Sequence, residues 1–83
     1  MNLVFEEKAQ KRLKKFSPEV SRKIIAKLGF FISAPSPLEF AERLINNDAG
    51  QYRFRIGDYR VIFDVEEDTI VVLTLGHRRE IYK

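Results

Sequence analysis

Arginine side chains recur at short intervals in the C-terminal third of the chain, in a pattern suited to binding a phosphate group. Arg53, Arg55 and Arg60 share one short segment, and Arg78 and Arg79 follow further along. A guanidinium group presents a rigid fork of N–H donors that matches phosphate oxygens, and it stays protonated at physiological pH. The sequence therefore indicates a site that binds a phosphate anion and stabilises its charge.

Two further side chains near these arginines could act on a bound phosphate ester. His77 is the only histidine of the chain, and an imidazole gains or loses a proton near neutral pH. Tyr82 could stack on a nucleobase or donate a hydrogen bond to a phosphate. With arginines to stabilise a phosphorane-like transition state, these side chains suffice for RNA cleavage by the 2′-hydroxyl group. A loop histidine with no catalytic role is the simpler alternative for His77.

The composition excludes other kinds of site. The 83 residues include no cysteine and one histidine, which rules out thiolate and multi-histidine metal sites. No carboxylate cluster suggests a magnesium site, so we expect neither metal nor cofactor. No apolar run has the length of a membrane span, and the first residues carry acids where a signal peptide is apolar. We therefore expect one cytoplasmic domain over residues 1–83.

The net charge of +3 is distributed unevenly along the chain. Residues 1–33 hold eight Lys or Arg and three Glu, whereas residues 61–74 hold four acids and no base. Basic patches of this kind are typical of proteins that bind a polyanion. An ordinary solvated helix face is the alternative for the N-terminal lysines.

Hydropathy patterns predict the elements that position these side chains. Residues 2–5 form a short apolar run typical of a strand, and residues 9–16 carry apolar side chains at helical spacing. Ser17-Pro18 has the pattern of a helix start, which predicts a second helix to about residue 33. Residues 36–44 begin with capping-box spacing and predict a short third helix. The turn-forming residues 46–50 predict a loop.

From residue 51 the apolar period becomes two, which predicts strands. Gly57-Asp58 has the pattern of a two-residue type II′ hairpin turn. The resulting register puts Arg55 directly opposite Arg60, and like charges at such positions repel each other. An anion held between the two guanidinium groups would relieve this repulsion. Alternatively, the side chains splay apart or Asp58 and Asp64 neutralise them.

A second turn at Glu67-Asp68 predicts a third strand of this meander. Residues 70–75 are almost all apolar, which is typical of a central strand covered on both faces. With this turn, Arg60 faces Leu75 and His77 lies just past the end of the strand. The register therefore predicts that the arginines and His77 come together.

Two segments resemble the RelE/ParE toxin superfamily, specifically its RelE-like branch: Y-R-F-R-I-G-D-Y-R-V-I-F at 52–63 and G-H-R-R-E-I-Y at 76–82. The resemblance covers essentially the whole chain. It implies an α+β fold, a small β-α-α-β-β-β domain in which a helical hairpin packs on a mainly antiparallel twisted sheet. RelE-like members are toxins of type II toxin–antitoxin pairs. They cleave mRNA in the ribosomal A site through 2′-hydroxyl attack and without metal, whereas ParE-like members poison DNA gyrase.

The resemblance implies four catalytic residues. Arg60 matches the arginine that stabilises the transition state, and Arg78 matches the arginine that assists the leaving group or the phosphate. Tyr82 matches the C-terminal tyrosine that orients or stacks on the substrate. His77 occupies a place where some relatives carry a catalytic histidine and others a lysine.

Three further arginines, Arg53, Arg55 and Arg79, are expected to bind the substrate phosphates. Relatives carry a lysine on the strand of Arg53 and Arg55 as a candidate base, and arginine is a poor base. Other relatives use a glutamate from the preceding helix, for which Glu39 and Glu42 are the candidates in this chain. The general base is therefore unassigned at this stage.

The resemblance also implies partners: a cognate antitoxin, the ribosome with its mRNA, and operator DNA bound through the antitoxin. Weak binding to ribosomal RNA by counterion release is expected from four basic residues, Lys8, Lys11, Arg12 and Lys15. A ParE-like gyrase poison and a catalytically weak member that mainly binds its antitoxin are the alternative functions.

Apolar side chains also occur on the sheet face opposite the helices. Their positions in the predicted register are Ile62, Val71, Leu73 and Leu75. Apolar surface of this extent is usually covered. An antitoxin segment or the chain's own short helix would cover it.

Overall fold

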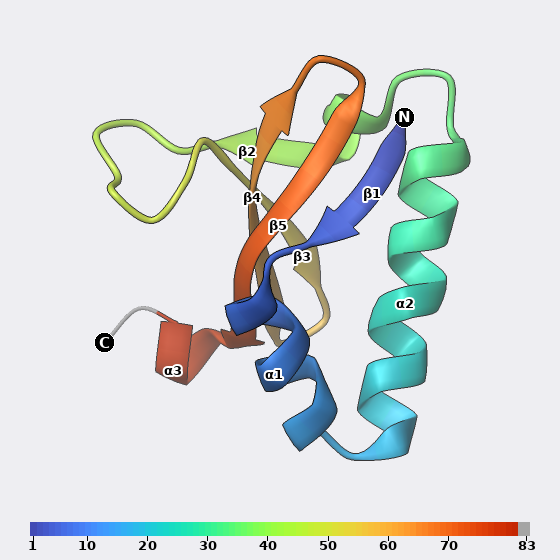
Figure 1. The fold of residues 1–83 in the computed structure, drawn as a ribbon, viewed down its shortest axis with the longest axis vertical. Coiled ribbons are helices and arrows are strands. Elements are labelled where there is room, and N and C mark those ends of the chain that lie inside the picture. Colours follow the sequence, from blue (N-terminus) through green and yellow to red (C-terminus); the bar gives the residue numbers. More distant parts are fainter. Residues whose placement is uncertain (82–83) are drawn as a thin grey trace.

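A computed structural model describes residues 1–81 (Figure 1). The elements, in chain order, are β1 (Asn2–Phe5), α1 (Glu7–Lys15), α2 (Pro18–Ser33), the 3₁₀ helix η1 (Pro37–Phe40), β2 (Ala41–Arg43), β3 (Tyr52–Ile56), β4 (Tyr59–Glu66), β5 (Thr69–His77) and α3 (Arg78–Ile81). Among these residues, no helix combines the length and apolar character needed to cross a membrane.

The five strands form one mixed sheet in the order β1-β5-β4-β3-β2. β1 pairs with β5 in parallel, and every other neighbouring pair is antiparallel. In Figure 1, α2 runs alongside β1 and α3 lies on the other side of the sheet. The predicted α+β fold with its helical hairpin is confirmed, and β2 is an additional strand.

The helical hairpin begins and ends where the sequence predicts. Ser17 caps α2, because its side chain accepts a hydrogen bond from the backbone N–H of Val20 at 3.3 Å, and Pro18 follows at the first helical position. The hydroxyl of Ser21 donates to the carbonyl of Leu13 at 2.9 Å and ties α2 to α1. The two helices therefore hold a fixed angle over the sheet.

Aromatic rings fill the space between α2 and the sheet. The ring centroids of Phe31 and Phe54 are 4.5 Å apart, and those of Phe54 and Phe63 are also 4.5 Å apart. Ile24 and Leu28 complete the helix side of this core and are fully buried. Burial of such side chains contributes about 1.5–3 kcal/mol each, so this layer holds the sheet in place.

The predicted helix over residues 36–44 is wrong. Ser36 makes no side-chain cap, and the single 3₁₀ turn ends at Phe40. Residues 41–43 then form β2, which pairs with β3 so that Ala41 faces Phe54 and Glu42 faces Arg53. The backbone donors and acceptors along the edge of β3 need partners, and a strand at this position supplies them.

The β3–β4 register is as predicted, including Arg55 opposite Arg60. The predicted β4–β5 register is correct only near the turn. A β-bulge shifts the pairing between Ile62 and Phe63, so that Arg60 faces Gly76 and not Leu75. An extra residue of this kind moves every later side chain to the opposite face. Leu75 thereby enters the core and is fully buried.

The loop between β2 and β3 covers apolar side chains on the face of the sheet opposite the helices. A Cβ atom on Gly50 would lie 2.7 Å from Cγ2 of Ile62 and 3.0 Å from Cδ1 of Leu73, so only glycine fits this approach. The backbone N–H of Gln51 donates to Asp64 at 2.8 Å and anchors the loop. Ile62 is only 2% exposed. The loop, and not the expected short helix, therefore covers Ile62, whereas Val71 and Leu73 remain partly exposed.

Candidate functional site

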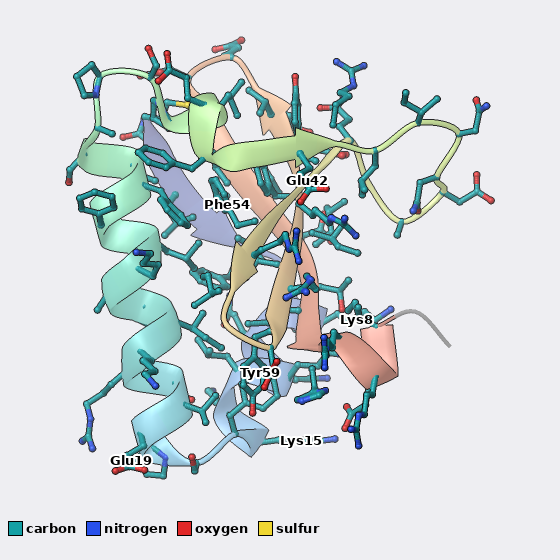
Figure 2. All side chains as sticks on the ribbon, turned by 180° about the vertical axis from the view of Figure 1, so that it is seen from behind. Lys8, Lys15, Glu19, Glu42, Phe54 and Tyr59 are labelled. Atoms are coloured by element: carbon teal, nitrogen blue, oxygen red, sulfur yellow. The ribbon has the colours of Figure 1, made fainter. Side chains whose placement is uncertain are left out.

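Five arginines line one open depression of about 460 Å³: Arg53 and Arg55 from β3, Arg60 from β4, and Arg78 and Arg79 from α3. The structure thus brings together all five arginines that the sequence singled out. In Figure 2, which views the molecule from behind, Glu42 marks the neighbouring strand β2. Such a concentration of fixed positive charge attracts a polyanion.

Arg60 is the buried member of the cluster, with 5% of its surface exposed. Its Nη1 donates to the carbonyl oxygens of Gly57 and Tyr59, both at 2.9 Å. Gly57 has a φ of +58°, which favours glycine and fits the predicted turn. The residue paired with Arg60 is Gly76, which has no side chain to crowd the guanidinium group. The hairpin turn therefore fixes the guanidinium before any ligand arrives.

The other end of the depression is formed by α3, which the hairpin turn also positions. The backbone N–H of Arg78 donates to the carbonyl of Asp58 at 2.7 Å, and its side chain lies 3.7 Å from the Asp58 carboxylate. Within residues 1–81, the side chain of Arg79 makes no hydrogen bond or ion pair. Arg79 is therefore available to a ligand.

Glu42 is the residue of this site that the sequence did not place. Its Oε2 lies 2.7 Å from Nη2 of Arg53, and its Oε1 lies 3.4 Å from Nη1 of Arg55. The hydrogen bond from Arg53, together with the charges of Arg53 and Arg55, lowers the pKa of Glu42 below its usual 4.5. Of the two glutamates considered as a base, Glu42 belongs to the cluster. Glu39 is exposed and makes no ion pair within the described residues.

The predicted meeting of His77 with the arginines is wrong. His77 pairs with Tyr59, and their rings meet edge to face at 5.5 Å on the sheet face where Phe16 also packs against Tyr59. His77 Nδ1 accepts a hydrogen bond from the backbone N–H of Arg79 at 3.1 Å. The β-bulge is the physical reason, because one extra residue in β5 turns His77 to the other face.

The N-terminal basic residues form a second patch, which lies on α1. Lys8, Lys11, Arg12 and Lys15 line a shallow surface with Glu7, and Lys11 pairs with Glu7 at 3.1 Å. A Cβ atom on Gly76 would lie 3.4 Å from Nη1 of Arg12. Because Gly76 on β5 is paired with Arg60 on the neighbouring strand β4, the α1 patch extends to the edge of the arginine cluster. Tyr82 lies outside the described residues.

Comparison with solved structures finds the same fold in toxin–antitoxin complexes. The RelBE2 complex of Mycobacterium tuberculosis contains a chain with 25% identity and a TM-score of 0.76, over 93% of this chain and 96% of that one. The RelE–RelB complex of Pyrococcus horikoshii contains a chain with 25% identity and a TM-score of 0.72, and the match covers 95% of this chain and 96% of that one. The isolated RelE toxin of E. coli has 23% identity and a TM-score of 0.71, over 98% of this chain and 89% of that one. At this identity, the match supports the fold and nothing further.

Sequence comparison identifies the family. A search of curated protein sequences gives no match. A family model described as the ParE toxin of the type II toxin–antitoxin system parDE matches residues 3–82. With the fold shared by the matched structures, this match places the chain in the RelE/ParE superfamily as a toxin of a type II toxin–antitoxin system.

Proposed function

We propose that this toxin is a ribosome-dependent endoribonuclease that cleaves mRNA in the A site without a metal ion. The observation that carries the proposal is the open depression lined by five arginines. In the proposed reaction, the 2′-hydroxyl of a nucleotide loses its proton to water as its oxygen attacks the adjacent phosphorus and forms a 2′,3′-cyclic phosphate. The bond to the 5′-oxygen of the next nucleotide breaks, and this oxygen takes up a proton from water. The residues described hold no group of three His, Asp or Glu side chains that could share a metal ion.

Electrostatic stabilisation is the main contribution that we assign to the protein. Arg60 is held by two backbone carbonyls, so it needs no reorganisation as negative charge develops on the phosphoryl oxygens. Arg53, Arg55 and Arg79 are assigned to the neighbouring phosphates. Arg78 is assigned to the leaving oxygen.

Among residues 1–81, no strong base lines the depression. The lowered pKa of Glu42 makes its carboxylate a weak proton acceptor, and His77 packs against Tyr59 on the other face. We therefore propose that His77 positions α3 through the N–H of Arg79 and does not accept the 2′-hydroxyl proton. Alignment of the mRNA by the ribosome then supplies much of the rate enhancement.

Partners follow from the same assignment. Solved relatives are described as RelB–RelE complexes, which supports a cognate antitoxin for this chain, with operator DNA bound through that antitoxin. The basic patch on α1 is proposed to contact ribosomal RNA, because lysines that replace condensed counterions give affinity without sequence specificity.

A gyrase poison is the second candidate, favoured by the ParE description of the matching family model. Such a toxin would act by binding and would need an exposed protein-binding surface. Phe30 and Ile25 on α2 are 56% and 45% exposed, and they are the side chains that this alternative would use. A catalytically weak member that mainly binds its antitoxin is the third candidate, favoured by the missing base.

Two parallel assays separate the candidates. Purified toxin is incubated with a defined mRNA, with and without programmed ribosomes, and separately with gyrase and relaxed plasmid. We expect cleavage at the A-site codon only with ribosomes, and unchanged supercoiling by gyrase. Inhibited supercoiling without RNA cleavage would establish the gyrase poison. Inactivity in both assays would favour the weak member.

A further inference from the structure

Glu42 forms ion pairs with two of the five arginines that line the depression. Its two carboxylate oxygens contact different guanidinium groups, Oε2 with Arg53 at 2.7 Å and Oε1 with Arg55 at 3.4 Å. Two oxygens of one anionic group shared between neighbouring guanidinium groups is also how a phosphate is bound. In the free protein, the Glu42 carboxylate therefore stands where a phosphate would make its contacts with these two arginines.

A carboxylate beside Arg55 offsets like-charge repulsion in this part of the sheet. Arg55 lies directly opposite Arg60, and like charges at directly opposite positions destabilise a sheet. Of the two aspartates considered for neutralising them, Asp64 is hydrogen-bonded to the backbone of Gln51 and Asp58 lies beside Arg78. Glu42, which faces Arg53 across the β2–β3 pair, is the carboxylate that contacts Arg55.

The contact is also easy to open. The side chain of Glu42 is 45% exposed, that of Arg55 is 60% exposed and that of Arg53 is 24% exposed, so the contact with Arg55 opens more readily than the contact with Arg53. Ion pairs with this exposure are weak, since water and salt compete for both partners. Glu42 belongs to β2, a three-residue strand at the edge of the sheet. An incoming anion can therefore displace the carboxylate without disturbing the core.

We propose that Glu42 is a built-in competitor for the phosphate site, so that an anion binds Arg53 and Arg55 only by displacing its carboxylate. A free phosphate or a loosely held RNA then binds poorly. An RNA held at several other points, as in the proposed ribosomal complex, displaces Glu42 and gains both arginines. Glu42 is thus a specificity-determining residue that favours anchored over free RNA. The anchored substrate rests on the proposed function, whereas the competition itself does not.

The competitor is present at every physiological pH. The hydrogen bond and charge of Arg53, with the charge of Arg55, keep the pKa of Glu42 below 4.5, so the carboxylate is ionised near neutrality. This property distinguishes a competitor from a base. A base must take up a proton during the reaction, whereas a competitor needs only to keep its negative charge.

Binding of a non-cleavable RNA tests the proposal. A short single-stranded oligonucleotide with 2′-O-methyl groups and a fluorescent label is titrated with the intact protein, with Glu42→Gln and with Glu39→Gln. Glu39→Gln removes the same charge from the adjacent exposed turn and serves as the matched control. We expect Glu42→Gln to bind about two- to fivefold more tightly than the control, the range expected from one exposed ion pair.

The salt dependence gives a second readout. If Glu42→Gln frees one further phosphate contact, the slope of log affinity against log salt steepens by about 0.7 for a single strand. Equal affinities and slopes for the two variants would overturn the proposal, because only net charge would then matter. Weaker binding by Glu42→Gln would also overturn it, by showing that the carboxylate positions the arginines for RNA.

A second variant covers the case in which Glu42→Gln fails to fold. Glu42→Asp keeps the charge but shortens the side chain, so it cannot bridge both arginines, and we expect affinity between wild type and Glu42→Gln. The readout is inorganic phosphate titrated against the NMR signals of the arginine Nε–H groups. Absence of any difference from wild type would count against competition. None of these assays involves cleavage, so an inactive nuclease with tighter Glu42→Gln binding would refute the proposed function alone.

Discussion

The two faces of the sheet are built on different principles. On the helix-covered face, stacked rings such as Phe54 and Phe63 and the fully buried Leu28 exclude water. On the opposite face, the arginine face, Arg55 lies opposite Arg60. A turn carbonyl accepts a hydrogen bond from Arg60, Glu42 pairs with Arg53, and the loop before β3 is anchored to Asp64. The first face supplies stability through apolar area. The second tolerates local repulsion, which makes it suited to receive an anion.

Removing a ring from the core should have the largest effect on stability. Phe54→Ala leaves a cavity between Phe31 and Phe63, and such truncations cost about 3–5 kcal/mol. A domain of this size has roughly 5–15 kcal/mol in total, so the midpoint of urea unfolding should fall steeply. Arg79→Ala, which removes an exposed side chain from the other face, serves as the comparison. Equal losses for both variants would contradict the division between the faces.

Gly50→Ala should show how tightly the arginine face is covered. The added methyl group would overlap Ile62 at 2.7 Å, and overpacking of this kind costs about 1–3 kcal/mol. Urea unfolding measures the loss. The double variant Gly50→Ala with Ile62→Leu should recover part of it, because leucine carries no methyl group on Cβ and so lacks the clashing Cγ2 atom. A neutral Gly50→Ala would mean that the loop does not rest on the sheet.

Relief of backbone strain at the β4–β5 turn should have a smaller, opposite effect. Glu67 has a φ of +55°, a conformation that asparagine adopts more readily than glutamate. Glu67→Asn should therefore stabilise the protein by about 0.5–1 kcal/mol. Glu66→Asn, on the neighbouring residue without this conformation, is the control in a thermal unfolding series. Destabilisation by Glu67→Asn would argue against a left-handed residue at the turn.

The smallest expected effect concerns pH. Arg53 lowers the folded-state pKa of Glu42 below 4.5, so this ion pair contributes stability above about pH 4.5 and loses it as the pH falls through the lowered value. The Tm of wild type should therefore slightly exceed that of Glu42→Gln at pH 7, and the two should converge in acid. A Tm difference that grows on acidification would have the wrong sign for a lowered pKa.

The sequence predicts the two faces unequally. The β3–β4 register was predictable because the Gly-Asp turn and the alternating apolar residues of β3 favour one pairing. The β-bulge was not predictable, because residues 70–73 are all apolar. A shift of the register by one residue therefore leaves the apolar pattern of this segment unchanged. The five arginines were therefore placed correctly, whereas His77 was assigned to the wrong face.

β2 was not predicted, and Glu42 was named but not placed, for a different reason. A three-residue strand has too little sequence to show a period, and the capping-box spacing of Ser36 and Glu39 favoured a helix. The structure chooses the strand because it pairs the edge of β3, which is a tertiary effect. The signal that was available is charge: Glu42 is an acid just ahead of a strand with two arginines.

In the proposed reaction, a preorganised Arg60 stabilises the negative charge that develops during mRNA cleavage on the ribosome. The most direct test compares single-turnover cleavage at the A-site codon by wild type, Arg60→Ala and Lys23→Ala, the last being a cation on α2 away from the cluster. Removal of one preorganised donor costs about 10²–10³-fold in rate. We predict that loss for Arg60→Ala with unchanged cleavage by Lys23→Ala. Undiminished cleavage by a folded Arg60→Ala would contradict this role for Arg60.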